Sequence, residues 1–233
     1  MSETWSTTIG EVKPDGYCLR GQPITELMAS GDWLGTLLLA LLGRDPKPYE
    51  RSLAAACLIG AIDHGTAPPS ARVTRVVASC GKPVADSVAA GLLTLGPRHG
   101  NAAAAAGEWL KAQIAQGIVP EQAVQTALSA GIRLSGFGHA EYERDPRAVT
   151  LAKLGQEVLP EAKHLVYALA VGDELTKQKG KPLYLNIDGA MGAIMADLEW
   201  PTELADVLFI LARSVGLCAH ALEEAPLSKS YRR

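Results

Sequence analysis

The sequence is poor in aromatic residues. Tyr, Trp and Phe make up 5% of its 233 residues, and only two of them are Phe. Sandwiches and barrels draw on aromatic and β-branched residues, whereas alanine and leucine, which abound here, are strong helix formers. The composition therefore predicts packed helices. The length is enough for one domain, or for a large domain with a small lobe.

Cysteine pairs at redox or zinc-binding spacing are also missing. None of the four cysteines belongs to a C-x-x-C motif, and all are far apart in the sequence. This usage is typical of a reduced protein rather than of a disulfide-stapled secreted one. We therefore expect free, buried thiols at all four positions, namely Cys18, Cys57, Cys80 and Cys218.

The chain has no excess of positive charge. Its 22 Lys and Arg against 25 Asp and Glu give a formal net charge of −3, which offers no basic field to a nucleic acid. Residues 1–8 lack the basic start and apolar run of a signal peptide, and the apolar run Leu34–Leu42 is well short of the about 20 residues of a membrane span. We expect a cytoplasmic protein with neither nucleic acid nor membrane as partner.

Local patterns predict a short hairpin followed by helices. β-Branched residues alternate around Pro14-Asp15-Gly16, which indicates a hairpin over Thr7–Gly21. From Pro23 onward the apolar spacing is helical. The predicted helices span residues 24–29, 34–42, 49–63, 70–79, 84–95, 102–117, 120–130, 148–158, 161–176 and 202–222. Core residues expected on the fourth and fifth are Val73, Val76, Val77, Val88, Leu92 and Leu93.

Three of the five histidines lie beside glycine at breaks between predicted helices: His64, His99 and His139. His164 and His220 lie within helices and are interpreted as structural. A metal site built from the three loop histidines and nearby aspartates is an alternative, but no H-x-x-x-H or H-E-x-x-H pair supports it. The chain also lacks a G-x-S-x-G elbow, a G-x-G-x-x-G turn and a P-loop.

The segment 136–148 is the most informative. Gly136 and Gly138 let a ligand approach the backbone next to His139, and Pro146 starts a helix whose first turn carries Arg147. An imidazole and a guanidinium on one segment can serve a carbonyl and a carboxylate of the same molecule. This pattern favours a small acidic ligand.

Two charged residues stand in apolar surroundings. Asp188 is either a base whose pKa burial raises or a helix N-cap, and Leu183–Gly189 is either a strand or the start of a buried helix. Arg213 lies on an apolar helix and needs an anionic partner, which is a protein carboxylate or a ligand.

Five segments, which contain the three loop histidines, Asp188 and Arg213, resemble in their order along the chain the active-site segments of the citrate synthase superfamily. The chain lacks the longer N-terminal helical region of full citrate synthases, and from end to end it is similar to citryl-CoA lyase and to the citrate-synthase-like C-terminal domain of ATP-citrate lyase. The segments are Asp63-His64-Gly65, Gly96-Pro97-Arg98-His99-Gly100, Gly136-Phe137-Gly138-His139 with Asp145-Pro146-Arg147, Asn186-Ile187-Asp188, and Ala212-Arg213-Ser214-Val215-Gly216.

The resemblance implies a mainly α, citrate-synthase-like multi-helix fold with a short N-terminal β-hairpin. Residues 1–233 would form one unit, a large helical domain with a smaller helical lobe inserted at about residues 100–190. It further implies a homodimer or higher homo-oligomer. No permanently bound cofactor or metal is implied, and a coenzyme A thioester is the substrate or product.

The resemblance also assigns roles. Asp188 matches the acid/base that exchanges a proton with the acetyl methyl carbon, His99 the donor to the thioester enolate oxygen, and His139 the group acting on the oxaloacetate carbonyl or the citryl hydroxyl. The positions that hold carboxylates are matched by His64, Arg147 and Arg213. Coenzyme A contacts are predicted at Gly96, Pro97, Gly100, Gly136 and Gly138.

Three functions remain open at this point. The first is cleavage of citryl-CoA to acetyl-CoA and oxaloacetate by a retro-Claisen step. The second is a citrate synthase or related acyl-CoA condensing enzyme, because His99 stands where the lyase-like domains commonly carry an aromatic residue. Ala140 likewise replaces an arginine frequent in the lyases. The third is a non-catalytic subunit that binds a dicarboxylate, such as oxaloacetate or citrate, or coenzyme A.

Overall fold

The computed structural model describes residues 5–14, 16–96, 99–100, 102–227 and 231. The chain divides into two compact units, Met1–Ala55 and Ala56–Arg233. The small lobe expected at about residues 100–190 stays a prediction.

The first unit contains the predicted hairpin and the first helices. Strands β1 (Gly10–Lys13) and β2 (Gly16–Leu19) pair antiparallel with Val12 opposite Tyr17, so the hairpin is confirmed. A short strand β3 (Gln22–Pro23), which the sequence did not predict, pairs with β2. Helices α1 (Ile24–Ser30) and α2 (Trp33–Leu42) follow, and α3 (Pro48–Ala61) carries the chain into the second unit.

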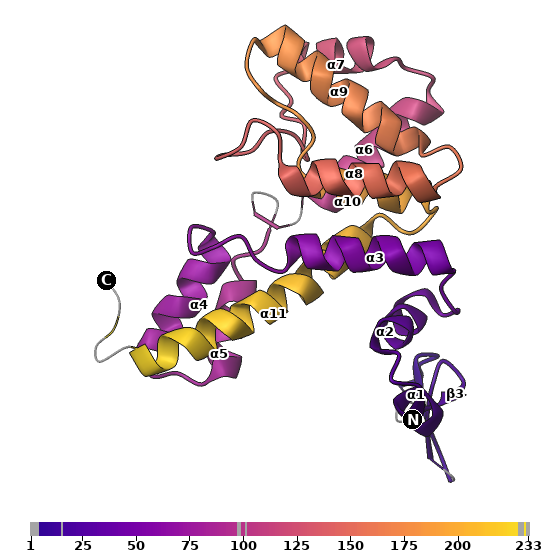
Figure 1. The fold of residues 1–233 in the computed structure, drawn as a ribbon, viewed down its shortest axis with the longest axis vertical. Coiled ribbons are helices and arrows are strands. Elements are labelled where there is room, and N and C mark those ends of the chain that lie inside the picture. Colours follow the sequence, from indigo (N-terminus) through magenta and orange to yellow (C-terminus); the bar gives the residue numbers. More distant parts are fainter. Residues whose placement is uncertain (1–4, 15, 97–98, 101, 228–230, 232–233) are drawn as a thin grey trace. The chain divides into compact units, whose positions relative to one another are not determined.

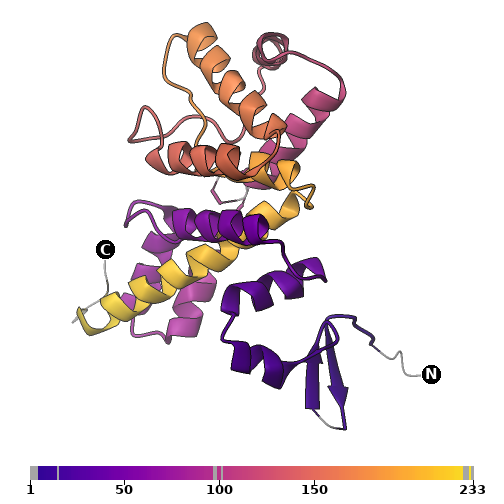
Figure 2. The same cartoon turned by 45° about the vertical axis from the view of Figure 1, so that its right-hand side comes forward.

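The second unit consists of helices joined by loops, with isolated β-bridges but no strand among its described residues, and it includes every predicted site residue that the structure describes. Helix α11 lies along α4 and α5, and it also contacts α6 and α10 (Figure 1). Figure 2 shows the same side-by-side arrangement of α4, α5 and α11 from a second direction. The helices are α4 (Pro69–Ser79), α5 (Val84–Leu92), α6 (Ala103–Ala115), α7 (Pro120–Ser129), α8 (Pro146–Val158), α9 (Lys163–Lys179), α10 (Ile187–Asp197) and α11 (Glu203–Leu227).

The predicted helices are all present, and the ambiguity at Leu183–Gly189 is resolved. Helix α10 begins at Ile187, and before it only Leu185 forms a single antiparallel bridge, with Phe137. The segment is therefore mainly the approach to a buried helix. Helix α5 ends at Leu92, three residues before the predicted end, and α11 continues past the predicted end to Leu227.

The core predicted on α4 and α5 is wrong. Leu93 is 87% exposed and Val76 is 42% exposed, and the other four predicted core residues are only half-buried. The inward faces carry small residues instead, because a Cβ on Gly91 would overlap the Thr74 hydroxyl of the facing helix. Helices this close leave no room for valine between them. The residues buried on these faces are Ser70, Ala71, Thr74, Ala78, Ser79, Ser87 and Gly91.

Helix α11 is long and apolar enough to cross a membrane by length and composition alone. However, 56% of its most apolar window is buried within the protein, and it packs against α4, α5 and α6. Its buried face also carries Arg213, His220 and Glu224. Helix α11 is therefore a core helix of the second unit, and it carries polar side chains on its buried face.

The cysteines form no disulfide among the described residues. Cys57 is buried, and burial raises the pKa of its thiol to about 12. The expectation of buried thiols is wrong for Cys80, which is exposed, while Cys18 and Cys218 are half-buried. A thiol reagent should therefore reach Cys80 first.

Helices α6 and α10 cross at contact distance between backbones. A Cβ on Gly192 would overlap the Ala103 carbonyl oxygen and lie 2.8 Å from the Gly107 nitrogen. The small residues of α6 therefore allow α10 to approach closely. This contact also fixes α10, whose first turn carries Asp188.

We expect Gly192→Ala to lower the free energy of unfolding by about 1–3 kcal/mol, because the added methyl group meets backbone atoms that cannot move aside. Urea titration followed by circular dichroism measures the change. The control is Gly10→Ala, whose Cβ would lie 3.9 Å from its nearest neighbour, the Cys18 carbonyl oxygen. An unchanged or raised stability of the Gly192 variant would contradict the close crossing.

Candidate functional site

The first histidine stands on a tight turn after α3. Helix α3 ends at Ala61, and the Asp63 Oδ2 atom accepts a hydrogen bond from the Gly65 backbone N–H at 2.9 Å. Gly65 has a φ of +88°, in the left-handed region that favours glycine. The turn places His64 just beyond the helix, as the sequence predicts.

One face of α11 holds this turn. The Arg213 Nε atom donates to the Ala61 carbonyl oxygen at 3.2 Å, and its Nη2 atom donates to His64 Nδ1 at 2.7 Å. One turn further along, Gly216 allows the helix backbone to approach the turn, since a Cβ there would overlap the Ile62 carbonyl oxygen. The sequence places Arg213 and Gly216 three residues apart, which is the spacing of one helix face.

The contact with Arg213 sets the proton position on His64. A guanidinium only donates, so His64 Nδ1 accepts and its ring proton lies on Nε2. Burial lowers the pKa of His64 to about 4, and the charges of Arg213 and Arg147 act in the same direction. At neutral pH His64 is therefore an uncharged imidazole that presents one N–H donor.

Arg213 is incompletely paired. It has no exposed surface, and among the described residues its Nη1 atom has no hydrogen-bond partner. The guanidinium carbon lies 4.9 Å from the ring of Phe209, and the negative charges of Asp63 and Asp188 and the positive charge of Arg147 also act on Arg213. A buried guanidinium N–H without a partner is costly, so this atom is suited to an anionic ligand.

The loop carrying His139 is tied to the start of α10. The Asn186 backbone N–H donates to the Gly136 carbonyl oxygen at 3.0 Å, and the Asn186 side chain donates to the Gly138 carbonyl oxygen at 2.9 Å. A Cβ on Gly136 would meet the backbone of Gly189, so glycine is needed at both positions. Two motifs that lie 50 residues apart in the sequence are thereby joined.

His139 and Arg147 direct two donors to one place. His139 Nδ1 accepts hydrogen bonds from the backbone N–H groups of Glu141 and Tyr142 at 3.1 and 3.2 Å, so its ring proton lies on Nε2. The Arg147 Nη2 atom lies 3.3 Å from that Nε2. Both atoms carry hydrogen, so they cannot bond to each other, and an oxygen between them would accept from both.

Asp145 orients Arg147 and joins two helices. As the N-cap of α8, it accepts from the Arg147 backbone and side chain, and its Oδ2 atom also accepts from the Ile187 backbone N–H at 3.0 Å. Burial raises the pKa of Asp145, but the hydrogen bonds and charge of Arg147 outweigh it and hold the pKa below its usual value. Its carboxylate stays charged and occupied by protein groups.

Asp188 is the carboxylate left for chemistry. The N-cap of α10 is Asn186, whose side chain accepts from the Gly189 N–H, so the interpretation of Asp188 as the cap is wrong. Asp188 keeps part of its residue surface exposed, but Oδ1 is sealed and has no partner among the described residues. Burial raises its pKa to about 6 against the opposing charges of Arg147 and Arg213.

His99 approaches the same group of residues from a separate loop. Its Nε2 atom lies 2.9 Å from the Ser70 hydroxyl on α4, and its backbone exchanges two hydrogen bonds with Gly96, at 2.7 and 2.8 Å. Burial lowers the pKa of His99, and the charge of Arg213 lowers it further. His99 is therefore uncharged at neutral pH.

The structure brings the predicted residues together. His64 bonds to Arg213, His139 lies against Arg147, and the charges of both arginines act on His64. The charges of both arginines also act on Asp188. The site combines N–H donors with one carboxylate of raised pKa, which suits an oxygen-rich anion.

Sequence reasoning missed the partners that hold these groups. Asp145 was noticed only as part of a motif, although an Asp-Pro pair before a helix is a cap signal. No local signal could have paired Ser70 with His99, because 29 residues separate them.

The predicted coenzyme A contacts are not decided by the geometry. Pro97 lies outside the described residues. Gly100 has a φ of +87°, and a Cβ there would lie 2.9 Å from the Phe209 ring, so packing alone explains a glycine. Coenzyme A contact stays a prediction for Gly96, Gly100, Gly136 and Gly138.

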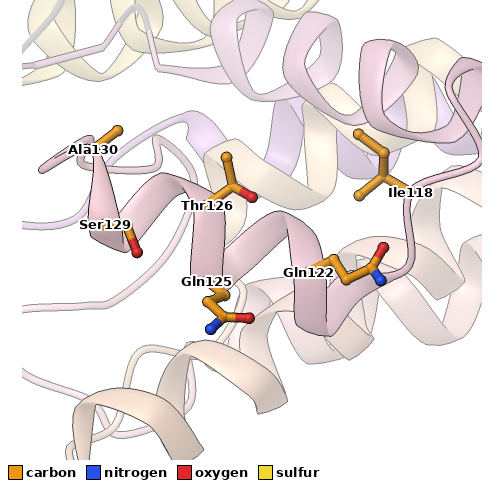
Figure 3. Close-up of a pocket in the computed structure, with 6 residues that line it drawn as sticks. All are labelled: Ile118, Gln122, Gln125, Thr126, Ser129 and Ala130. Atoms are coloured by element: carbon orange, nitrogen blue, oxygen red, sulfur yellow. The ribbon is translucent and has the colours of Figure 1, made fainter.

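A separate hollow lies along α7 and holds none of these groups. Figure 3 shows its side chains, which belong to one helix and the residues beside it. No residue lining this hollow, of about 570 Å³, carries a titratable side chain, so it offers no acid or base. Its lining residues are Ile118, Gln122, Gln125, Thr126, Ser129 and Ala130.

Comparison with known proteins decides the family. The sequence profile described as "Citrate synthase, C-terminal domain" matches residues 9–233. The chain belongs to the citrate synthase family. Among citrate synthase relatives, it is 30% identical over 245 residues to the ATP-citrate synthase beta chain protein 2 of Arabidopsis thaliana. The match covers 97% of this chain but 40% of the relative, so the chain spans less than half of that protein's length.

Solved structures agree with this assignment. The citryl-CoA lyase of Hydrogenobacter thermophilus is 33% identical with a TM-score of 0.88, and the match covers 98% of this chain and 91% of the lyase. A variant of the Methanosaeta concilii ATP citrate lyase, solved with (3S)-citryl-CoA, is 27% identical with a TM-score of 0.92. That match covers 100% of this chain and 41% of the other. The expected citrate-synthase-like helical fold is therefore confirmed.

The raised pKa of Asp188 predicts a pH-dependent stability. Between its usual value of 3.8 and about 6, the folded protein binds more protons at Asp188 than the unfolded chain, so raising the pH through this window removes stability. Asp188→Asn abolishes the effect. Because the residue keeps some exposure, we expect the variant's stability relative to the unmodified protein to rise by about 2 kcal/mol from pH 4 to pH 7.

Urea unfolding at the two pH values measures this difference. Asp86→Asn is the matched control for the loss of an exposed aspartate, since Asp86 is exposed on α5. A difference for the Asp188 variant that changes with pH no more than that of the control would show that the Asp188 carboxyl is not perturbed by burial.

Proposed function

We propose that the protein cleaves citryl-CoA to acetyl-CoA and oxaloacetate by a retro-Claisen step. The observation that carries the proposal is that the charges of Arg147 and Arg213 both act on Asp188, whose Oδ1 atom has no partner among the described residues, and that each arginine lies beside a histidine N–H donor. The similarity to a citryl-CoA lyase over nearly the whole of both chains supports it.

The donor set fits the carboxylates of such a substrate. A citryl group carries free carboxylates and a hydroxyl in a small volume, and guanidinium groups bind carboxylates with two parallel hydrogen bonds. The unpaired Arg213 Nη1 and the neighbouring His64 Nε2–H form one anchor. Arg147 forms a second beside His139.

Cleavage changes two parts of the substrate, the hydroxyl group and the thioester unit. As the bond between the hydroxyl-bearing carbon and the thioester methylene breaks, its electron pair passes to the thioester unit and forms an enolate. The hydroxyl proton leaves to water, and the oxygen's negative charge is held by Arg147 and His139 Nε2–H until the ketone of oxaloacetate forms. Asp188 in its acid form protonates the enolate carbon, which completes acetyl-CoA.

The pKa of Asp188, about 6, suits this exchange. Near neutral pH both of its protonation states are populated, so it can give a proton to carbon in cleavage or remove one in the reverse direction. An ordinary aspartate would hold almost no proton at that pH. The predicted cytoplasmic location and homo-oligomer stay predictions.

A condensing enzyme of the citrate synthase type is the second candidate. The observation that favours it is His99, an uncharged imidazole held 2.9 Å from Ser70 in the same site. An imidazole N–H can stabilise the enolate of acetyl-CoA as it forms. The same residues would then serve synthesis and cleavage, and the physiological direction would depend on the substrates supplied.

Purified protein tests the proposal directly. Supplied with citryl-CoA, it should release acetyl-CoA and oxaloacetate in equal amounts, as measured by chromatography and by coupled malate dehydrogenase. With acetyl-CoA and oxaloacetate, net release of free thiol without citryl-CoA cleavage would move the assignment to synthesis. Binding of oxaloacetate without either reaction would indicate a non-catalytic subunit.

We expect Asp188→Asn to lower kcat for cleavage by at least about a hundredfold, because the carbon acid/base is lost, while citrate affinity changes little. Steady-state assays and calorimetry measure the two quantities separately. Full turnover in this variant would contradict the assigned role.

His99→Phe tests whether His99 stabilises the enolate. If His99 is the enolate donor, the substitution should lower kcat by about tenfold to a hundredfold with a smaller change in KM. The control is His164→Asn, because His164 bonds to Asp197 outside the site. Undiminished cleavage in His99→Phe would remove His99 from the enolate and leave Asp188 and the arginines with the chemistry.

A further inference from the structure

His220 is the residue of α11 that the chemistry above does not use. It lies seven residues after Arg213, and both side chains contact the segment between α3 and α4 or the end of α3. Its Nε2 atom lies 3.0 Å from Asp63 Oδ1, and its Nδ1 atom lies 3.2 Å from Arg75 Nη1. His220 therefore connects α4 to the turn that carries His64.

Arg75 decides which nitrogen of His220 carries the proton. A guanidinium only donates, so His220 Nδ1 accepts and Nε2–H donates to Asp63. Arg75 is itself held by Glu224 at 2.6 Å and by Glu223 at 3.3 Å, and its side chain is only 11% exposed. The direction of the hydrogen bond to Asp63 is thus set by a fixed ion-pair network.

Asp63 has a competing partner nearby. Its negative charge acts on Arg213, whose Nη1 atom is buried and has no partner among the described residues. At present the two Asp63 oxygens accept from His220 and from the Gly65 N–H. Without the His220 donor, Oδ1 would gain most by turning to the guanidinium, and it would occupy the N–H that a ligand needs.

We propose that His220 is a positioning residue that holds Asp63 away from Arg213 and so keeps the Arg213 Nη1 atom available to a substrate carboxylate. The identity of that ligand, a small polycarboxylate, rests on the function proposed above. The positioning itself is a property of the protein's own residues.

Two variants of similar size separate positioning from simple structural support. In His220→Gln the side-chain amide reaches as far as Nε2 and retains a donor to Asp63, but loses the acceptor for Arg75. In His220→Asn the side chain reaches only as far as Nδ1, so it retains an acceptor for Arg75 and loses the donor. A purely structural role predicts similar effects for both.

Calorimetric titration with oxaloacetate gives the first readout. We expect His220→Asn to weaken binding by about tenfold or more, the value of one charge-assisted hydrogen bond, and His220→Gln to stay within about threefold of the unmodified protein. In cleavage assays the Asn variant should raise KM more than it lowers kcat. Equal affinities in the two variants, accompanied by equal drops in Tm, would overturn the proposal.

Titration of the His64 ring by NMR gives a second readout that needs no substrate. His64 is faced by Arg213, Arg147, His99 and Asp63, and its pKa is about 4. If Asp63 turns to Arg213 in His220→Asn, the guanidinium charge is offset and the pKa of His64 rises toward its usual value of 6.5. In His220→Gln it should stay near 4.

The two readouts distinguish the proposals from each other. If the unmodified protein binds no oxaloacetate, the proposed function fails, yet the shift of His64 in the Asn variant alone would still establish the positioning. A His64 titration that is identical in both variants would overturn it, whatever the activity.

Discussion

The incompletely paired guanidinium of Arg213 is the constraint on which the site depends. It has no exposed surface, and among the described residues its hydrogen bonds go only to the Ala61 carbonyl and to His64. Burying a charge in this way is unfavourable unless other interactions compensate. The compensation comes from the packing of α11 against α4 and α5, and from a ligand when one is bound. Gly216 lets the backbone of α11 approach the turn that carries His64.

The aspartates of the site either hold protein groups in place or remain available for the reaction. Asp145 and Asp63 are carboxylates whose oxygens are occupied by protein donors, and the pKa of each lies below its usual value despite burial. Asp188 has a sealed, unpartnered oxygen and a raised pKa. The same residue type thus performs two tasks, and the number of hydrogen bonds it accepts decides which. One reactive carboxylate among N–H donors is the minimum that carbon acid chemistry on a polycarboxylate requires.

The sequence predicted the parts of this site that are local. Glycines next to His64, His99 and His139, and a lone arginine on an apolar helix, are signals within a few residues. The order of the motifs then identified the family and the fold. Pairings across the chain were not predictable, since the bond between His220 and Asp63 spans 157 residues. Periodicity also misplaced the core of α4, because it reports hydrophobicity but not how closely Gly91 lets two helices approach.

A crystal structure with citrate bound would test the central claim most directly, namely that the free donors of the two arginines form a polycarboxylate site beside Asp188. The account predicts one carboxylate on the Arg213 Nη1 and His64 Nε2 atoms, another on Arg147, and the hydroxyl oxygen within hydrogen-bond distance of His139 Nε2. Citrate bound elsewhere, or Asp63 paired with Arg213 Nη1 in its presence, would contradict the account.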